Sequence, residues 1–170
     1  MFRKRLFKIA LLGLSFFTLL ALAGLTACGP GETELPFETI ERSDLGDYSV
    51  REPRLILITA PQEIDQVEGL ITREALDRLV ELDFGQYFAI AVFRGTQATS
   101  GYDVIVERVA RRGDKIVVYA QFWSPSPHYG VRNEATSPYH LIKVRRDDGV
   151  SQETELVFRS LVVTPTPPSR

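Results

Sequence analysis

Hydrophobic and polar positions divide the chain into a long apolar stretch, a section with helical spacing and a series of strand-like segments. No charged residue occurs from Ile9 to Ala27, a run close to the ~20 residues that an apolar helix needs to span a bilayer. Apolar residues then recur at helical spacing between Pro61 and Leu82, and strand-like patterns begin at Tyr87. The pattern predicts a β-rich α+β domain behind an N-terminal apolar segment.

Two short helices are expected between residues 61 and 82. Pro61 suits the first turn of one helix, and Ile64 and Val67 follow it at helical spacing. The second helix is expected from about Thr72 to Leu82. Its core-facing stripe would consist of Ala75, Leu76, Leu79, Val80 and Leu82.

Six segments read as strands. The first is the apolar run RLILIT at residues 54–59, and the other five are YFAIAVFRG, GYDVIVERVAR, KIVVYAQFW, YHLIKVRR and ETELVFRSLVV. Turn residues 112–114 and 147–149 predict hairpins, so we expect an antiparallel sheet, closed as a barrel or packed as a sandwich. Within KIVVYAQFW, one face is expected in the core: Ile116, Val118, Ala120 and Phe122.

The N-terminus has the pattern of an export signal, because four positive charges in residues 1–8 precede the apolar stretch. The stretch ends in Leu25-Thr26-Ala27-Cys28, which resembles the lipobox of bacterial lipoproteins. The resemblance implies that signal peptidase recognises Leu25, Thr26 and Ala27, and that the Cys28 thiol becomes a thioether to diacylglycerol. Acyl chains would then insert into the bacterial membrane and hold the protein at its outer side. An uncleaved transmembrane helix is the alternative.

Composition divides the remaining chain into three segments and limits the classes of partner that it can bind. Residues 28–36 read as a flexible tether, residues 37–163 as a single β-rich domain, and residues 164–170 as a disordered Pro-rich tail. Without residues 1–27 the chain has 16 basic and 22 acidic residues, which argues against nucleic-acid binding. The doublets Arg111-Arg112 and Arg145-Arg146 are expected at solvated hairpin ends.

No catalytic set is recognisable in the sequence. Motifs such as HExxH, CxxC and GxSxG do not occur, and no glycine loop is built to cradle phosphate. The two histidines, His128 and His140, lack the further ligands that a metal site needs. We therefore expect a non-enzymatic protein without metal or cofactor, although a Ser–His–Asp set assembled in space stays open as an alternative.

Three loop segments carry the candidate contact residues: GTQATSGY at 95–102, FWSPSPHY at 122–129 and ATSPYH at 135–140. Loops held by a rigid sheet often carry function, and Trp and Tyr are favoured binding anchors. The glycine at position 101 is expected to adopt a positive φ. The predicted partner-binding residues are Thr99, Ser100, Gly101, Tyr102, Trp123, Tyr129, Pro138 and Tyr139. Alternatively, Trp123 and Tyr129 cap the core.

The series FAIAVFRG, TSGYDVIVERVARRGDKIVVYAQFWSPSP and ATSPYHLIKVRR resembles the PrcB C-terminal domain family. The resemblance covers Tyr87–Arg146. It departs from the family where Gln97-Ala98-Thr99 stands in place of a frequent proline. The resemblance implies a lipoprotein that binds and stabilises a cell-surface protease complex, with no catalytic residues of its own.

A second resemblance gives an alternative function. Thr99-Ser100-Gly101-Tyr102 looks like the Thr-Thr-Gly-Tyr/Phe loop of chagasin-type cysteine-protease inhibitors, which also sit on β-sandwiches. This likeness implies a loop that wedges into the cleft of a protease rather than a docking surface.

Overall fold

A computed structural model describes residues 31–126, 130–146, 150–151 and 153–164. The chain divides into two units, residues 1–31 and residues 32–170, and every described strand and helix lies in the second unit. The predicted signal peptide, the lipobox and Cys28 lie outside the described residues, as do Tyr129, His128 and the tail from residue 165.

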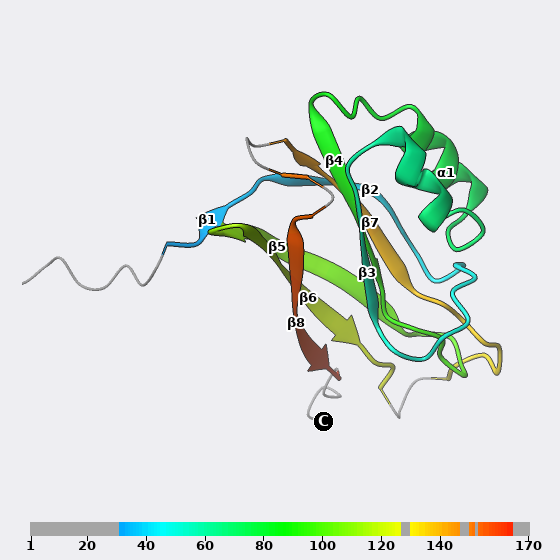
Figure 1. Cartoon of the computed structure of the whole chain (residues 1–170). Helices are drawn as coiled ribbons and strands as arrows, with labels where there is room; N and C mark the ends of the chain where they lie inside the picture. The colour runs from blue at the N-terminus through cyan, green and yellow to red at the C-terminus, as the bar shows by residue number, and fades with distance from the viewer. Residues whose placement is uncertain (1–30, 127–129, 147–149, 152, 165–170) are drawn as a thin grey trace, which may run out of the picture. The chain divides into compact units, whose positions relative to one another are not determined.

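The second unit contains two four-stranded sheets (Figure 1). Sheet A has the order β1 (Thr33–Glu34), β5 (Asp103–Arg112), β6 (Lys115–Trp123) and β8 (Glu155–Val163). Sheet B has the order β2 (Phe37–Ser43), β7 (Tyr139–Arg145), β4 (Tyr87–Phe93) and β3 (Arg54–Ile58). The β-rich fold with mostly antiparallel pairing is confirmed, and of the two expected architectures the structure has a sandwich and no closed barrel.

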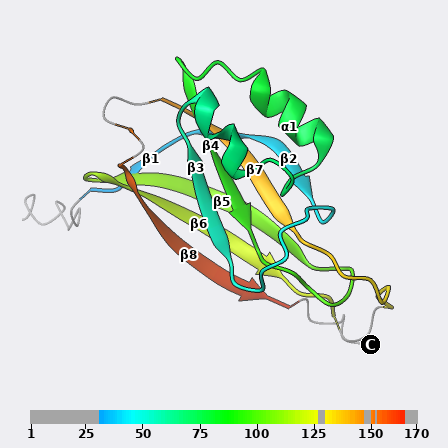
Figure 2. The ribbon, with the colours of Figure 1, turned by 45° about the vertical axis from the view of Figure 1, so that its right-hand side comes forward.

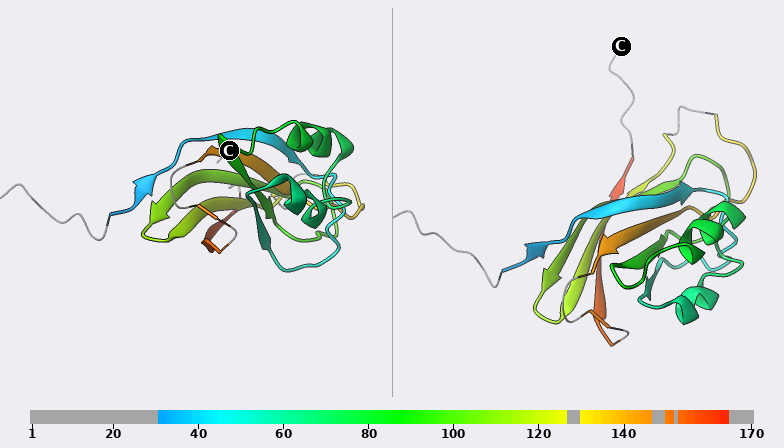
Figure 3. Two further views of the ribbon diagram at one scale, coloured as in Figure 1. Left: turned by 45° about the horizontal axis from the view of Figure 1, so that its top comes forward. Right: turned by 90° about the horizontal axis from the view of Figure 1, so that it is seen from above.

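Sheet B is the middle of three layers, as Figures 2 and 3 show. On β4, Phe88, Ile90 and Val92 pack toward sheet A, while the alternate residues Ala89 and Ala91 pack toward the helices. Burial of both faces explains why this strand is a continuous apolar run instead of an alternating one. The predicted core face of β6 is also confirmed, because Ile116, Val118, Ala120 and Phe122 lie between the sheets.

The helices are shorter than predicted. The first is a 3₁₀ helix, η1 (Pro61–Gln66), and the second is α1 (Arg73–Val80). The Thr72 side chain caps α1 by accepting a hydrogen bond from the Ala75 N–H at 3.2 Å. Ala75 and Leu79 are buried as expected, but Val80 is 63% exposed, so its placement in the core stripe was wrong.

The pairing of β8 differs from the hairpin expected at residues 147–149, which lie outside the described residues. β8 does not continue sheet B beside β7; it joins sheet A and pairs in parallel with β6, from Lys115↔Glu155 to Trp123↔Val163. A local turn signal indicates a change of direction but does not determine which strand edge is available.

Part of the expected tether belongs to the folded unit. Thr33 and Glu34 pair with Arg111 and Ala110, and Leu35 is only 6% exposed. The expectation that Arg146 is a solvated hairpin end is also corrected. Its guanidinium donates to the carbonyl oxygens of Thr59, Phe84 and Val150, at 2.6, 3.2 and 3.1 Å.

Candidate functional site

Two of the predicted loops are hydrogen-bonded to each other. Gln97 and Thr136 form an antiparallel bridge, with N···O distances of 2.8 and 3.0 Å. The Ser100 N–H donates to the Arg132 carbonyl at 3.1 Å, and the Arg132 N–H donates to the Ser100 hydroxyl at 2.9 Å. The Thr136 hydroxyl donates to the Thr99 carbonyl at 3.0 Å. These bonds hold loop 96–102 against residues 130–138.

The predicted segment 122–129 contacts segment 95–102 at Gly101. Gly101 has the expected positive φ, +89°, and a Cβ placed there would lie 3.0 Å from Cβ of Pro125. The described part of the FWSPSP segment therefore packs beside loop 96–102.

A fourth segment, residues 44–51, joins this cluster although it carries no recognisable sequence pattern. The Thr96 N–H donates to the Val50 carbonyl at 2.9 Å, and the Thr96 hydroxyl donates to the Tyr48 carbonyl at 2.7 Å. The Ser137 hydroxyl donates to the same Tyr48 carbonyl at 3.0 Å. We call the four segments, 44–51, 95–102, 124–126 and 130–138, the loop end.

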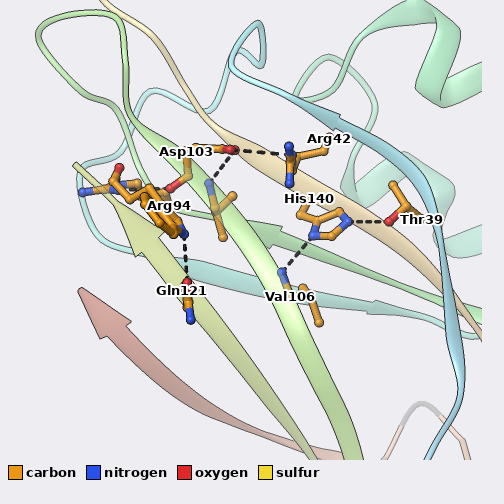
Figure 4. A network of polar contacts seen from close by, with 9 residues as sticks. Thr39, Arg42, Arg94, Asp103, Val106, Gln121 and His140 are labelled. Carbon is orange, nitrogen blue, oxygen red and sulfur yellow. Dashed lines mark hydrogen bonds and ion pairs between the residues drawn. The ribbon is translucent and has the colours of Figure 1, made fainter. Parts of the chain in front are cut away.

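Arg94, at the end of β4, holds the loop end to sheet A (Figure 4). Its guanidinium is buried, with 7% of the residue exposed. It donates to the carbonyls of Asp103 at 3.0 Å and Trp123, and to the Ser124 hydroxyl at 2.9 Å. The charge also lies 4.7 Å from the ring centroid of Tyr102. Burial lowers the pKa of Arg94.

Apolar side chains are exposed on this bonded framework. Leu45, Val50 and Val131 expose 73%, 47% and 41% of their surfaces. Leu45 and Val50 lie in segment 44–51, and Val131 lies in segment 130–138. None of the three stood out in the sequence because single Leu and Val residues are ordinary in loops.

Comparison with known proteins agrees with the resemblance found in the sequence. Residues 88–145 match the family model described as PrcB C-terminal. This segment is a PrcB C-terminal domain. No match was found among curated proteins or among solved structures.

The PrcB C-terminal domain supplies the central strand pair of each sheet. It begins within β4 and ends with β7, so it contributes β5 and β6 to sheet A and β4 and β7 to sheet B. Strands from outside the matched segment flank each pair: β1 and β8 in sheet A, β2 and β3 in sheet B. The loops of the PrcB C-terminal domain form three of the four segments of the loop end.

Several predicted contact residues are accessible. Gly101 is exposed, and Thr99, Ser100, Tyr102 and Trp123 are partly exposed. The indole N–H of Trp123 donates to Gln121 Oε1 at 2.9 Å, and the Gln121 amide in turn donates to Glu107 at 2.6 Å. Trp123 therefore lies along β6, beside the loop end.

Tyr139 and Pro138 are buried, so the expectation that they form a contact surface is corrected. The Tyr139 hydroxyl donates to Glu41 Oε1 at 2.7 Å and accepts from the Thr72 N–H at 3.1 Å. Burial raises the pKa of Tyr139 to about 12. This residue joins β7, β2 and the start of α1, and its role is structural.

His140 points to the opposite side of β7, between the two sheets (Figure 4). Its Nδ1 accepts from the Val106 N–H at 2.9 Å, so the ring proton sits on Nε2, which donates to the Thr39 hydroxyl at 2.8 Å. β1 pairs only with Ala110 and Arg111 of β5 and does not reach Val106. The Val106 N–H bonds to His140 instead. Burial, with a contribution from Arg42, lowers the pKa of His140 to about 4, and the ring is neutral.

The described residues offer neither a cluster of metal ligands nor a helix suited to spanning a membrane. No group of three or more His, Cys, Asp or Glu side chains among them is placed to hold a metal ion. In the same residues, no helix combines the length and the apolar character needed to cross a bilayer.

Proposed function

We propose that the chain is a lipid-anchored extracytoplasmic binding module whose loop end docks a protein of the cell envelope, such as a surface protease. The observation that carries this proposal is the exposure of Leu45, Val50 and Val131 on one hydrogen-bonded framework. Exposed apolar side chains on one ordered surface offer contact area to a protein partner. The resemblance to PrcB supports a protease complex as the setting.

Rigidity of the loop end supports binding. Cross-loop bonds at Gln97, Ser100 and Thr136, together with the buried Arg94, fix the backbone before any partner arrives. A surface that is already ordered loses little conformational entropy on association, so more of the contact energy remains as affinity.

Anchoring at Cys28 is the second part of the proposal. It rests on the charged start, the apolar stretch and the Leu25-Thr26-Ala27-Cys28 sequence. The acidic balance of the mature chain supports a protein partner in preference to nucleic acid.

Site-specific crosslinking in the cell of origin tests the docking surface. A photoreactive amino acid at Val50 or Val131 should give the same discrete product with a second protein. Val80 offers a matched control, because it is an equally apolar residue that is 63% exposed on α1. No product at Val50 and Val131, or an identical product at Val80, would contradict the proposal.

A charge substitution sharpens that experiment. Val131→Asp should abolish the product formed from position 50, because a carboxylate would have to be desolvated in an apolar contact. Val80→Asp should leave the product unchanged.

Protease inhibition is a second candidate, and the exposure of Gly101 favours it. The residues before Gly101 are hydrogen-bonded, and Tyr102 lies on Arg94, so residues 99–102 form a stiff projecting loop. The lipid-free chain should then inhibit a papain-like protease at micromolar concentration, and Gly101→Asp should remove the inhibition. Full protease activity in the presence of the chain would exclude this candidate.

A further inference from the structure

The folded unit is joined to sheet A from Glu32 onward. The Glu32 carboxylate accepts hydrogen bonds from Arg108 at 3.0 Å and from the Tyr119 hydroxyl at 2.9 Å. β1 then pairs with the last residues of β5, and the Leu35 N–H donates to the Val109 carbonyl at 2.8 Å. The start of the unit is therefore fixed beside one end of β5.

Only Gly29, Pro30 and Gly31 separate Glu32 from Cys28. An extended chain spans at most about 3.5 Å per residue, so the Cα atoms of Cys28 and Glu32 are no more than about 14 Å apart. The tether expected from the sequence is thus reduced to a short linker.

β1, where the linker joins the folded unit, and the loop end lie at opposite ends of sheet A. β5 starts at Asp103, next to the loop end, and finishes at Arg112, next to β1 and the turn at Gly113. At about 3.3 Å per residue, this ten-residue strand separates the two ends by about 30 Å. Figures 1 and 3 show β1 on the side away from the loops that make up the loop end.

We propose that β1 and the β5–β6 turn, residues 111–115, face the membrane, and that the loop end is held away from it. We call this surface the hairpin end. The inference rests on the proposed anchoring at Cys28, and it follows from the length of the linker rather than from charge.

Charge at the hairpin end does not explain membrane contact. Lys115 is paired with Glu155 at 2.6 Å and Arg108 with Glu32 at 3.0 Å. Asp114 and Glu34 balance the charges of Arg111 and Arg112 at the same end, so the hairpin end has no excess of positive charge. Because attachment is covalent, the orientation should persist at high salt, where attraction of exposed cations to anionic lipids is screened.

Fluorescence quenching tests the orientation on the full chain, purified with its lipid and reconstituted into phospholipid vesicles that carry a nitroxide on the headgroup. A fluorophore is attached through Asp114→Cys at the hairpin end or through Ala98→Cys at the loop end, both exposed positions. We expect several-fold stronger quenching at position 114, unchanged at high salt. Equal quenching, or stronger quenching at position 98, would overturn the proposal.

Lengthening the linker provides a second test. A flexible Gly-Ser insertion of about 12 residues between Pro30 and Gly31 should remove the difference between the two labels while the protein stays on the vesicles. The same insertion after Val163 is the control and should leave the difference intact. A difference that survives the first insertion would show that the linker does not set the orientation.

Vesicle flotation and the mass of the N-terminal peptide separate this inference from the proposed function. A chain that keeps Met1 and does not float would overturn both the anchoring and the orientation. A lipidated chain that floats but shows equal quenching would overturn the orientation alone.

Discussion

The loop end and the hairpin end are stabilised by different kinds of polar interaction. Beside the loop end, Arg94 and His140 are buried and bonded to backbone groups of other strands. At the hairpin end, the pairs Arg108–Glu32 and Lys115–Glu155 are partly exposed to solvent. Loss of a buried partner leaves an unsatisfied group that costs about 1–3 kcal/mol, whereas exposed ion pairs contribute little. The comparison predicts that the loop end is the more sensitive to substitution.

The largest effect is expected for Arg94→Met, which keeps the apolar stem but removes every donor. The carbonyls of Asp103 and Trp123 would lose a buried partner, and the Ser124 hydroxyl would lose another. We expect a loss of about 4 kcal/mol in the free energy of unfolding, measured by urea denaturation of the lipid-free chain. Arg108→Met is the matched control at the hairpin end, and a loss of similar size there would break the comparison.

The second-largest loss of stability is expected at acid pH, where His140 becomes protonated. The unfolded chain binds a proton on this ring near the ordinary pKa of 6.5, but the folded chain does so only near 4. Stability from the neutral ring is therefore complete above about pH 6.5 and is lost as the pH falls toward 4, by about 3 kcal/mol in all. Unfolding measured between pH 7 and pH 4 should show this loss, and His140→Asn should flatten that part of the profile. An unchanged profile in the variant would assign the acid sensitivity to other groups.

A pair of glycines tests backbone packing at the two ends. A Cβ at Gly95 would lie 2.1 Å from the Arg51 carbonyl oxygen, so Gly95→Ala forces the two segments of the loop end apart. At Gly113, which also has a positive φ, a Cβ would meet no atom within 4 Å. Thermal unfolding should show a loss of about 1 kcal/mol for Gly113→Ala, from backbone strain alone, and at least about 2 kcal/mol for Gly95→Ala. Equal losses would mean that the loop end relaxes freely.

The smallest effect on folding stability is expected for Lys115→Gln. The pair with Glu155 raises the pKa of Lys115, but both groups are solvated, and salt screens such pairs. The thermal midpoint of the variant should match that of the parent chain at physiological salt. A clear loss of stability would show that the ion pair holds β8 in place.

Sequence reasoning recovered the centre of the molecule better than its edges. The strands from Tyr87 to Arg145 have long apolar runs and a Gly113 turn, which are local signals that survive without tertiary information. β2 was missed because FETIERS is an edge strand with weak alternation and no fully buried residue. β8 was found as a strand, but its parallel partner depends on which sheet edge is free.

The candidate site was only partly predictable for the same reason. Loop residues 99–102 and Trp123 were found from turn and aromatic patterns, whereas segment 44–51 carries no such pattern. Arg94 stood near the end of the predicted strand YFAIAVFRG, and only the fold reveals the carbonyls that surround it. Tyr139 was placed on the surface because its partner Glu41 is 98 residues away in the chain.

The central position of the PrcB C-terminal segment makes its two strand pairs dependent on the flanking chain. Residues 88–145 alone would expose four unpaired strand edges, two on each sheet, and such edges invite aggregation. In this chain the flanking strands β1, β8, β2 and β3 cover all four of these edges. The neighbours along the chain can differ widely in sequence, since hydrogen bonding along an edge depends on backbone rather than on side-chain identity.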